Sequence, residues 1–554
     1  MKHQRYSSAV NVALLFLVFA GLPAAAQIQV DSASPSAAPQ GTVNLDVVIT
    51  GNGFKKGAVA QWFVSGTTNP GGVTVNSTTY KGATQLTANI TVAPDAVISG
   101  FDIVVTNADR RTGKGTDKFA VTLKGTPIGC TTTGTPSGFS LATVLNPVQP
   151  NGAALITTGT LGNAISVRPI DLNRDSVVDT LLAFVVSGGY QTGVTYLFLL
   201  DPVTGKRQAT NPVSGIAWQN PMTLLTGLRG TQAEAGDVNG DGVPDFLIAN
   251  TDTTAYLFVG SLSGPPAYTV SYTSYPIAHP ASAPGYWQIA AAMGDLDGDG
   301  MDEIALGARP AKGDKTPPGV YIFKYSAGAV NFVRQINDPT GVLSSLFGSA
   351  IAIGNVDGNP GNELVVGAKT GGANGLVYVF PYPAQQSNYF TFAGTTPSFG
   401  TVVGVADVNM DGVPDLVVIN ASQALVYPGY VHAGESFTNQ LNGASGLTDL
   451  WAYPNSDMGQ VLTSGAVAVG APNATLDKNC QGGVGAVHLF TSPFASSQYP
   501  NSVFEPPDLV GGSGAQYGFG VAIVPGYPFV IIGEHFRPVG TTAGAGQVYV
   551  YKAN

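Results

Sequence analysis

Short runs in which apolar and polar residues alternate recur along the whole chain, separated by Gly, Pro and Asn. Alternation with a period of two predicts half-buried β-strands, and residues 28 to 124 carry enough such runs for a small β-sandwich of about 95 residues. These runs are Asn44–Phe54, Ala58–Phe63, Leu86–Val92, Phe101–Ala108 and Lys118–Leu123. The pattern favours an all-β protein over a helical one.

A longer unit repeats from residue 139 onward. Each copy gives a strand, an acidic nine-residue loop, a second strand, a further loop, a third strand and usually a fourth. This order is that of one propeller blade. The five acidic loops start at Asp171, Asp237, Asp295, Asn355 and Asp407.

Two further units keep the strand frame without an acidic loop, around Val467–Pro472 and Phe529–Glu534. Seven units predict a seven-bladed ring. The last unit has no fourth strand before the end of the sequence, whereas a spare alternating segment, Phe139–Leu145, precedes the first unit. We expect this segment to complete the seventh blade and to close the ring, which removes exposed sheet edges.

An aromatic column precedes the loops. Eight residues before each loop stand Asn163, Arg229, Trp287, Phe347 and Phe399, and the last two are followed by Gly. In the loopless units, Met458–Gly459 and Phe519–Gly520 are assigned to the same position. The Phe-Gly pair, the acidic loop and the terminal Gly-Ala of the second strand resemble FG-GAP repeats, the units of the integrin α-subunit propeller.

The N-terminal segment SASPSAAPQG followed by VVITGNGFKKG resembles the immunoglobulin-like IPT/TIG family. The predicted fold is therefore all-β, a seven-bladed β-propeller of FG-GAP type preceded by a small Ig-like β-sandwich. The predicted boundaries are a signal peptide at 1–26, the sandwich at 27–124, a linker at 125–138 and the propeller at 139–554.

The acidic loops place oxygen-bearing side chains at positions 1, 3, 5 and 9, and the backbone carbonyl at position 7 completes a shell suited to Ca2+. We therefore predict up to five Ca2+ ions. The predicted ligands are Asp171, Asn173, Asp175, Val177 and Asp179; Asp237, Asn239, Asp241, Val243 and Asp245; Asp295, Asp297, Asp299, Met301 and Glu303; Asn355, Asp357, Asn359, Gly361 and Glu363; and Asp407, Asn409, Asp411, Val413 and Asp415.

Two other interpretations of the loops are weaker. An EF-hand needs an acidic residue at position 12 and a following helix, whereas position 12 is apolar in all five copies and lies in a strand-like run. A polar turn explains one copy, but five copies with the same side chains would gather repelling carboxylates unless a cation offsets them.

Composition agrees with metal sites. Charged residues make up only 10% of the 554 residues, and the net charge is −10, or −12 once Lys2 and Arg5 are removed with the signal peptide. Of the 34 acidic residues, fifteen stand at predicted ligand positions. The acidic balance therefore reports cation sites, and nothing in it indicates a nucleic-acid partner.

The first 26 residues have the basic start, apolar core and small-residue end of a secretory signal. No transmembrane segment is predicted. We expect a secreted protein, extracellular or at the cell surface, or periplasmic if the source is a Gram-negative bacterium. Cys130 and Cys480 allow a disulfide in such a compartment, with two separate thiols as the alternative.

Function is predicted as non-catalytic adhesion or ligand binding. The acidic loops occupy one propeller face, and we expect a protein or glycan ligand on the opposite face, where the long loops Ala308–Gly319, Ala368–Gly375, Ala471–Gly485 and Glu534–Gly546 gather. A lectin-like module is the alternative, although Trp287 is better explained by core packing. A polysaccharide- or phospholipid-degrading enzyme is a further alternative, with Glu534 and His535 as its candidate pair.

Overall fold

The computed structural model describes residues 28–94, 96–97, 99–122, 135–146, 160–188, 194–215, 222–226, 232–249, 254–279, 286–309, 318–420, 423–442, 460–463, 465–472, 474, 484–507, 516–524, 526–535 and 546–554. Within these residues the chain forms strands, turns and bends. Cys130, Arg229, Met458–Gly459 and Cys480 lie outside the described residues, so their predicted roles stay predictions. No helix in the described part of the chain is long and apolar enough to span a membrane.

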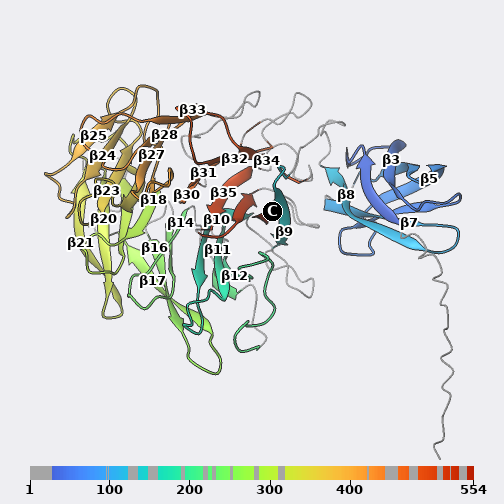
Figure 1. Ribbon diagram of the computed structural model, residues 1–554, viewed down its shortest axis with the longest axis horizontal. Helices are drawn as coiled ribbons and strands as arrows, with labels where there is room; N and C mark the ends of the chain where they lie inside the picture. The colour runs from blue at the N-terminus through green and yellow to red at the C-terminus, as the bar shows by residue number, and fades with distance from the viewer. Residues whose placement is uncertain are drawn as a thin grey trace, which may run out of the picture.

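The N-terminal part consists of two four-stranded sheets that share one hydrophobic core (Figure 1). Trp62 of β4 and Phe101 of β7 are fully buried in this core because strand side chains point to alternate faces, and Phe54, which follows β3, is buried with them. The first sheet has the order β1 (Gln29–Ser34), β3 (Leu45–Asn52), β6 (Gln85–Val92) and β5 (Val73–Gly82); the second has β2 (Ala37–Pro39), β8 (Thr112–Thr122), β7 (Ser99–Thr106) and β4 (Val59–Val64).

All five strands predicted here are present, and β8 begins earlier than expected. Strands β1, β2 and β5 were not predicted. Most residues of β5, VTVNSTTYKG, are polar and at least partly exposed, so the alternation of apolar and polar residues that predicts a strand is weak there. Membership of the immunoglobulin-like IPT/TIG family stays a prediction.

Seven further sheets follow in sequence, each with at least four strands. In Figure 1 they are arranged around a ring, with colours that run from teal through yellow to red. The first four sheets contain β10 (Thr160–Ile170), β11 (Thr180–Gly188), β12 (Val194–Leu200) and β13 (Met222–Thr226); β14 (Gln232–Gly236), β15 (Asp245–Ala249), β16 (Thr254–Leu262) and β17 (Val270–Ala278); β18 (Tyr286–Gly294), β19 (Glu303–Arg309), β20 (Gly319–Ser326) and β21 (Ala329–Asn337); and β22 (Phe347–Gly354), β23 (Glu363–Ala368), β24 (Leu376–Phe380) and β25 (Phe390–Ala393).

The last three sheets contain β26 (Val402–Ala406), β27 (Asp415–Ile419), β28 (Gln423–Tyr427) and β29 (Asn439–Asn442), with β33 (Ser497–Gln498) added to the edge; β30 (Gln460–Thr463), β31 (Ala466–Ala471), β32 (Ala486–Thr491) and β34 (Ser502–Phe504); and β35 (Tyr517–Ile523), β36 (Phe529–Glu534), β37 (Gln547–Ala553) and β9 (Phe139–Leu145). This all-β architecture of successive four-stranded sheets is consistent with a β-propeller.

The hydrophobic core lies between consecutive sheets. One cluster joins sheet one to sheet two through Phe184 and Phe246, whose rings stack at 4.5 Å. Another joins sheet seven to sheet one, because Ile531 and Val548 pack with Val185. Each sheet therefore buries apolar surface against the sheet on either side, and the seventh sheet packs against the first in the same way.

Strand β9 pairs antiparallel with β37, and Val548 lies opposite Leu145. The predicted closure by Phe139–Leu145 is therefore confirmed. The segment supplies the outer strand of the seventh sheet, as the missing fourth strand of that unit indicated.

Glycine pairs explain the Phe-Gly and Gly-Ala positions. Gly348 and Gly400 adopt the left-handed backbone, with φ of 80° and 77°. The carbonyl of Gly400 lies so close to Gly367 of the preceding sheet that a Cβ on Gly367 would overlap it. The same approach joins Gly348 to Gly307, so neighbouring blades meet through backbone at these positions.

Two assignments in the aromatic column are wrong. The buried pair Leu161–Gly162 takes this position in the first sheet, where Asn163 was predicted, and Tyr517–Gly518 takes it in the seventh, where Phe519–Gly520 was predicted. Gly162 packs on Gly533, and Gly518 packs on Gly470. In the first sheet the offset arises because β10 runs two residues further before its loop than the fixed spacing assumed.

Candidate metal loops

Each acidic loop connects the first strand of a sheet to the second, and its side chains fold the loop onto itself. In the second loop Asp237 accepts hydrogen bonds from the backbone N–H groups of Gly240 and Gly242, both at 2.8 Å. Asn239 Oδ1 accepts from the N–H of Asp241 at 3.0 Å, and Asp241 Oδ1 accepts from Val243 at 2.8 Å. Carboxylate and amide oxygens at positions 1, 3 and 5 are therefore turned toward the loop interior, as Asx turns require.

The first and fifth loops repeat this network. Asp171 accepts from the N–H of Ser176 at 2.6 Å, and Asp407 accepts from that of Gly412 at 3.0 Å. Position 6 has a left-handed backbone in both, with φ of 71° at Ser176 and 91° at Gly412. Ser176 therefore tolerates the conformation that glycine adopts in the second, third and fifth loops.

Position 9 has one role in all five loops. Its carboxylate accepts a hydrogen bond from the backbone N–H at position 2, at 2.8 to 2.9 Å, in Asp179, Asp245, Glu303, Glu363 and Asp415. In the second and fifth loops the other oxygen accepts from a glycine N–H, from Gly260 within the third strand at 2.7 Å and from Gly429 just after the third strand at 3.0 Å. Position 9 thus joins the loop to the sheet.

These position-9 carboxylates are buried, except for the half-buried Asp179, and desolvation raises their pKa. The pKa of Asp245 is raised to about 7 and that of Asp415 to about 6, mainly by desolvation, with repulsion from Asp241 and Asp411 adding to it. Desolvation likewise raises the pKa of Asp179, Glu303 and Glu363. A charged carboxylate at these positions is therefore unfavourable unless a cation lies nearby.

The fourth loop differs in chemistry. Asn355 replaces the first aspartate, and its amide nitrogen donates to the carbonyl of Asn359. Asp357 and Glu363 supply its two carboxylates. Pro360 at position 6 has no N–H to bond Asn355, so this loop offers the weakest fit to a divalent cation among the five.

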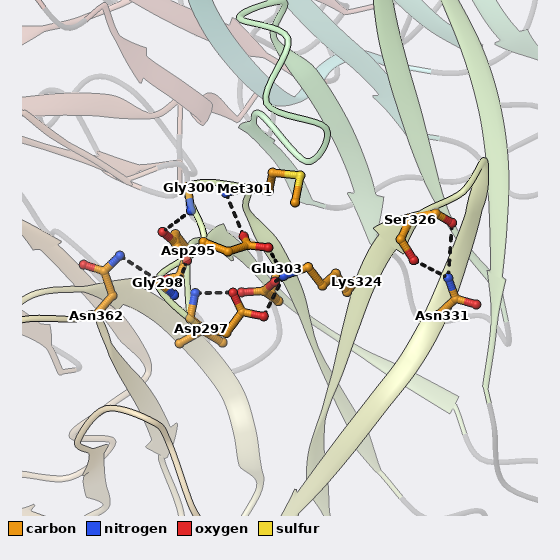
Figure 2. Close-up of polar contacts among 12 residues, drawn as sticks. Asp295, Asp297, Gly298, Gly300, Met301, Glu303, Lys324, Ser326, Asn331 and Asn362 are labelled. Carbon is orange, nitrogen blue, oxygen red and sulfur yellow. Dashed lines mark hydrogen bonds and ion pairs between the residues drawn. The ribbon is translucent and has the colours of Figure 1, made fainter.

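The third loop has carboxylates at all four predicted side-chain ligand positions, and a lysine of β20 reaches them. Figure 2 shows the side chain of Lys324 extending from β20 toward Asp297 and Glu303. Its Nζ donates to Asp297 Oδ2 and Asp299 Oδ2, both at 2.6 Å, and lies 2.9 Å from Glu303 Oε1. Burial alone would lower the pKa of Lys324, but these hydrogen bonds raise it above its ordinary value.

Carboxylate oxygens of Asp295, Asp297 and Glu303 all lie within 4.8 Å of one another. This acidic cluster could hold a metal ion. It is the one group of this kind that the described residues contain. Lys324 was not identified from the sequence, although it is the charged residue of an otherwise apolar strand pattern, GVYIFKY.

The remaining predicted ligands are the carbonyls of Val177, Val243, Met301, Gly361 and Val413. These residues stand at position 7. In four of the loops their backbone N–H donates to the position-5 carboxylate at 2.8 to 3.0 Å, so positions 5 and 7 lie next to each other. Coordination of Ca2+ by these carbonyls, and the number of ions, stay predictions.

Residues proposed for other activities are buried. Glu534 is fully buried at the end of β36, and its Oε2 accepts a hydrogen bond from Tyr549 at 2.6 Å. The ring of His535 stacks on Phe519 at 4.5 Å.

Of the long loops expected to contact a ligand, Ala368–Gly375 is fully described, and Gly372 and Ala373 are exposed in it.

The comparisons with known proteins agree with the repeat. An FG-GAP-like repeat model matches residues 237–306, and an FG-GAP repeat model matches residues 399–434. Integrin alpha-V of Gallus gallus is 29% identical over 210 residues, 34% of this chain and 20% of that protein. Integrin alpha-IIb of Mus musculus is 27% identical over 235 residues, 38% of this chain and 22% of that protein.

The chain therefore contains FG-GAP repeats and has integrin α-like propeller homology, while spanning about a fifth of the length of these relatives. A solved structure titled "Structure of Dos1 propeller" covers 75% of this chain and 95% of its own, at 11% identity and a TM-score of 0.34. The strand order of the sheets, and not this similarity, carries the description of the fold.

Proposed function

We propose that this protein is a secreted, calcium-stabilised, integrin-like propeller that acts as a non-catalytic adhesion or ligand-binding scaffold. The observation that carries the proposal is the shared side-chain arrangement of the first, second and fifth loops. In each, three carboxylates and one amide surround a loop that turns at position 6, and oxygen ligands at this spacing suit Ca2+.

Ca2+ supplies positive charge at positions where the chain has gathered negative charge. Asp237, Asn239, Asp241 and Asp245 would hold one ion in the second loop, and the corresponding residues would do so in the first and fifth loops. Since position 9 is bonded both to its loop and to the sheet, an ion there stabilises the blade as well as the turn. The ions are structural in this proposal, and binding of the ligand occurs elsewhere.

The ligand would contact the opposite face, which includes Ala368–Gly375. Integrin alpha-V and alpha-IIb are among the relatives that match this chain, so a protein at a cell surface is the ligand class we favour. Glycan binding is the second candidate.

The test is attachment of cells to surfaces coated with the mature protein, in Ca2+ and in EDTA. We expect attachment in Ca2+, its loss in EDTA, and its reduction by Ala373→Trp, which adds bulk at an exposed loop position. Asp31→Asn, an exposed change in the sandwich, is the matched control. Attachment that is equal in EDTA, or abolished by glycosidase treatment of the cells, would contradict protein adhesion, and the second result would favour glycan binding.

A further inference from the structure

The position of Lys324 sets the third loop apart. Phe323 pairs with Ile304, the residue that follows position 9 of this loop, so Lys324 comes directly after that pair. By the same register the equivalent residues are Val259 in the second sheet, Pro381 in the fourth and Pro428 in the fifth. An ammonium group therefore stands at this place beside the third loop, where the second, fourth and fifth sheets have an uncharged residue.

The contacts of Lys324 are those expected of a cation in this loop. Its three N–H donors match three carboxylates, from positions 3, 5 and 9. These are three of the four side chains that we predicted as metal ligands. Lys324 is 20% exposed and Glu303 is 3% exposed, so this contact is shielded in part from water and is stronger than a surface pair, whereas Asp297 and Asp299 are exposed and bind Lys324 at the surface.

Charge gives an independent argument. The third loop has four carboxylates at its predicted ligand positions, since Asp297 replaces the asparagine found at position 3 of the first, second and fifth loops. Lys324 reduces the charge of this group to −3, the charge of the three carboxylates in each of those loops. The carboxylates also gather most closely where the ammonium is present: among the five loops, all of them described, the compact cluster occurs in the third.

We propose that Lys324 is the built-in counter-cation of the third loop. It takes the place of Ca2+ among Asp297, Asp299 and Glu303, so this loop is formed without metal and binds Ca2+ more weakly than the first, second and fifth loops. The comparison with those loops rests on the proposed function. A divalent ion can enter only if the ammonium group moves away from all three carboxylates.

The experiment is a Ca2+ titration of the full-length mature protein by calorimetry, with equilibrium dialysis for the number of bound ions. For Lys324→Gln we expect one more bound ion per chain, or a site at least about tenfold tighter, because the competing charge-assisted hydrogen bonds are gone. Lys81→Gln, an exposed lysine of the sandwich, has the same charge change and should bind as the unmodified protein does.

A second variant guards against loss of folding. Lys324→Gln with Asp297→Asn gives the third loop the same side chains at positions 1, 3 and 5 as the second loop, without excess negative charge. It should fold in chelator and show the same gain in Ca2+ binding, and a further Asp299→Asn change should remove that gain. In EDTA, Lys324→Gln alone should unfold at a lower temperature than the unmodified protein, and Ca2+ should restore it.

The outcomes separate the two proposals. If the unmodified protein binds Ca2+ and neither Lys324 variant binds more or tighter, the counter-cation role is overturned and the proposed function stands. If the unmodified protein binds none and the Lys324 variants gain one ion, the counter-cation role stands and the calcium-stabilised scaffold does not. If no variant binds Ca2+, both are overturned.

Discussion

Asp302 and Asp237 bond each other in both directions, although they belong to loops of different sheets. The backbone N–H of Asp237 donates to Asp302 Oδ2 at 2.8 Å, and the backbone N–H of Asp302 donates to the carbonyl of Asp237 at 2.9 Å. The next junction has a related bond, from the amide of Asn362 to the carbonyl of Asp295 at 2.9 Å. At these two junctions position 8 of one loop therefore bonds position 1 of the loop before it.

Replacing Asp302 by Ala should destabilise the protein by about 1 to 3 kcal/mol, because the N–H of Asp237 loses a half-buried acceptor. Asp302→Asn keeps an acceptor oxygen and should cost much less. Denaturant unfolding of the two variants measures the difference in the free energy of unfolding. Equal losses would mean that the charge of Asp302, and not its hydrogen bond, joins the two loops.

Asp241→Asn tests a loop that lacks a lysine. Without Ca2+ this variant should be as stable as the unmodified protein or slightly more so, because one of the repelling carboxylates becomes neutral. In about 1 mM Ca2+ it should lose the stabilisation from one site, roughly 0.4 to 1.4 kcal/mol. Thermal unfolding with and without EDTA measures both effects, with Asp31→Asn as control. A variant that gains as much from Ca2+ as the unmodified protein would show that the second loop binds no ion.

Metal-free protein should lose stability as the pH rises. The pKa values of Asp245 and Asp415 are raised to about 7 and about 6 in the folded chain, above the value of about 3.9 in an unfolded one. A group whose folded pKa is raised contributes stability that is complete below about pH 4 and is lost as the pH passes through about 6 to 7.

Unfolding free energies in EDTA at pH 5 and pH 8 check this sign, and the value at pH 8 should be lower. Ca2+ favours the ionised carboxylates, so its addition at pH 8 should recover the loss. The double variant Asp245→Asn with Asp415→Asn should show a much flatter profile. Stability that rises with pH in EDTA would mean that other groups dominate.

Gly367→Ala should be among the most damaging single changes in the propeller. The new Cβ would overlap the carbonyl of Gly400 in the next sheet and would meet Ala350 at 3.0 Å. Since the obstacle is backbone, the sheets themselves have to separate, at a cost of more than about 3 kcal/mol. Gly264→Ala, where no atom lies within 4 Å, is the matched control and should be nearly neutral. Soluble yield and denaturant midpoint compare the two.

The sequence predicted the strands and loops well wherever a repeat supplied several copies of the same signal. Spacing failed where one strand carried extra residues: Leu161–Gly162 lies ten residues before Asp171, whereas Phe347 lies eight before Asn355. A fixed offset cannot detect this shift, because β10 continues from Ala164 to Ile170 after its bulge, whereas β22 continues only from Ala350 to Gly354 after the matching bulge.

Lys324 shows a second limit. It follows its loop by more than twenty residues and belongs to the third strand, so linear spacing does not associate it with Asp297. The register of β19 against β20 brings them together. Two signals together could have identified the contact between Lys324 and Asp297. They are the additional carboxylate at position 3 of the loop and the single lysine in the third strand of the same unit.

The pairing of β9 with β37 also bears on how the molecule assembles. Leu145 pairs with Val548, so the seventh sheet cannot form until all the sheets that lie between them in the sequence have been synthesised. Contacts between residues so distant in sequence form slowly, and until then the edge of β37 offers unpaired backbone to other chains. The form most prone to self-association is therefore the ring in which β9 is not yet paired. Pairing of the seven residues of β9 determines whether the ring closes or β37 pairs with another copy.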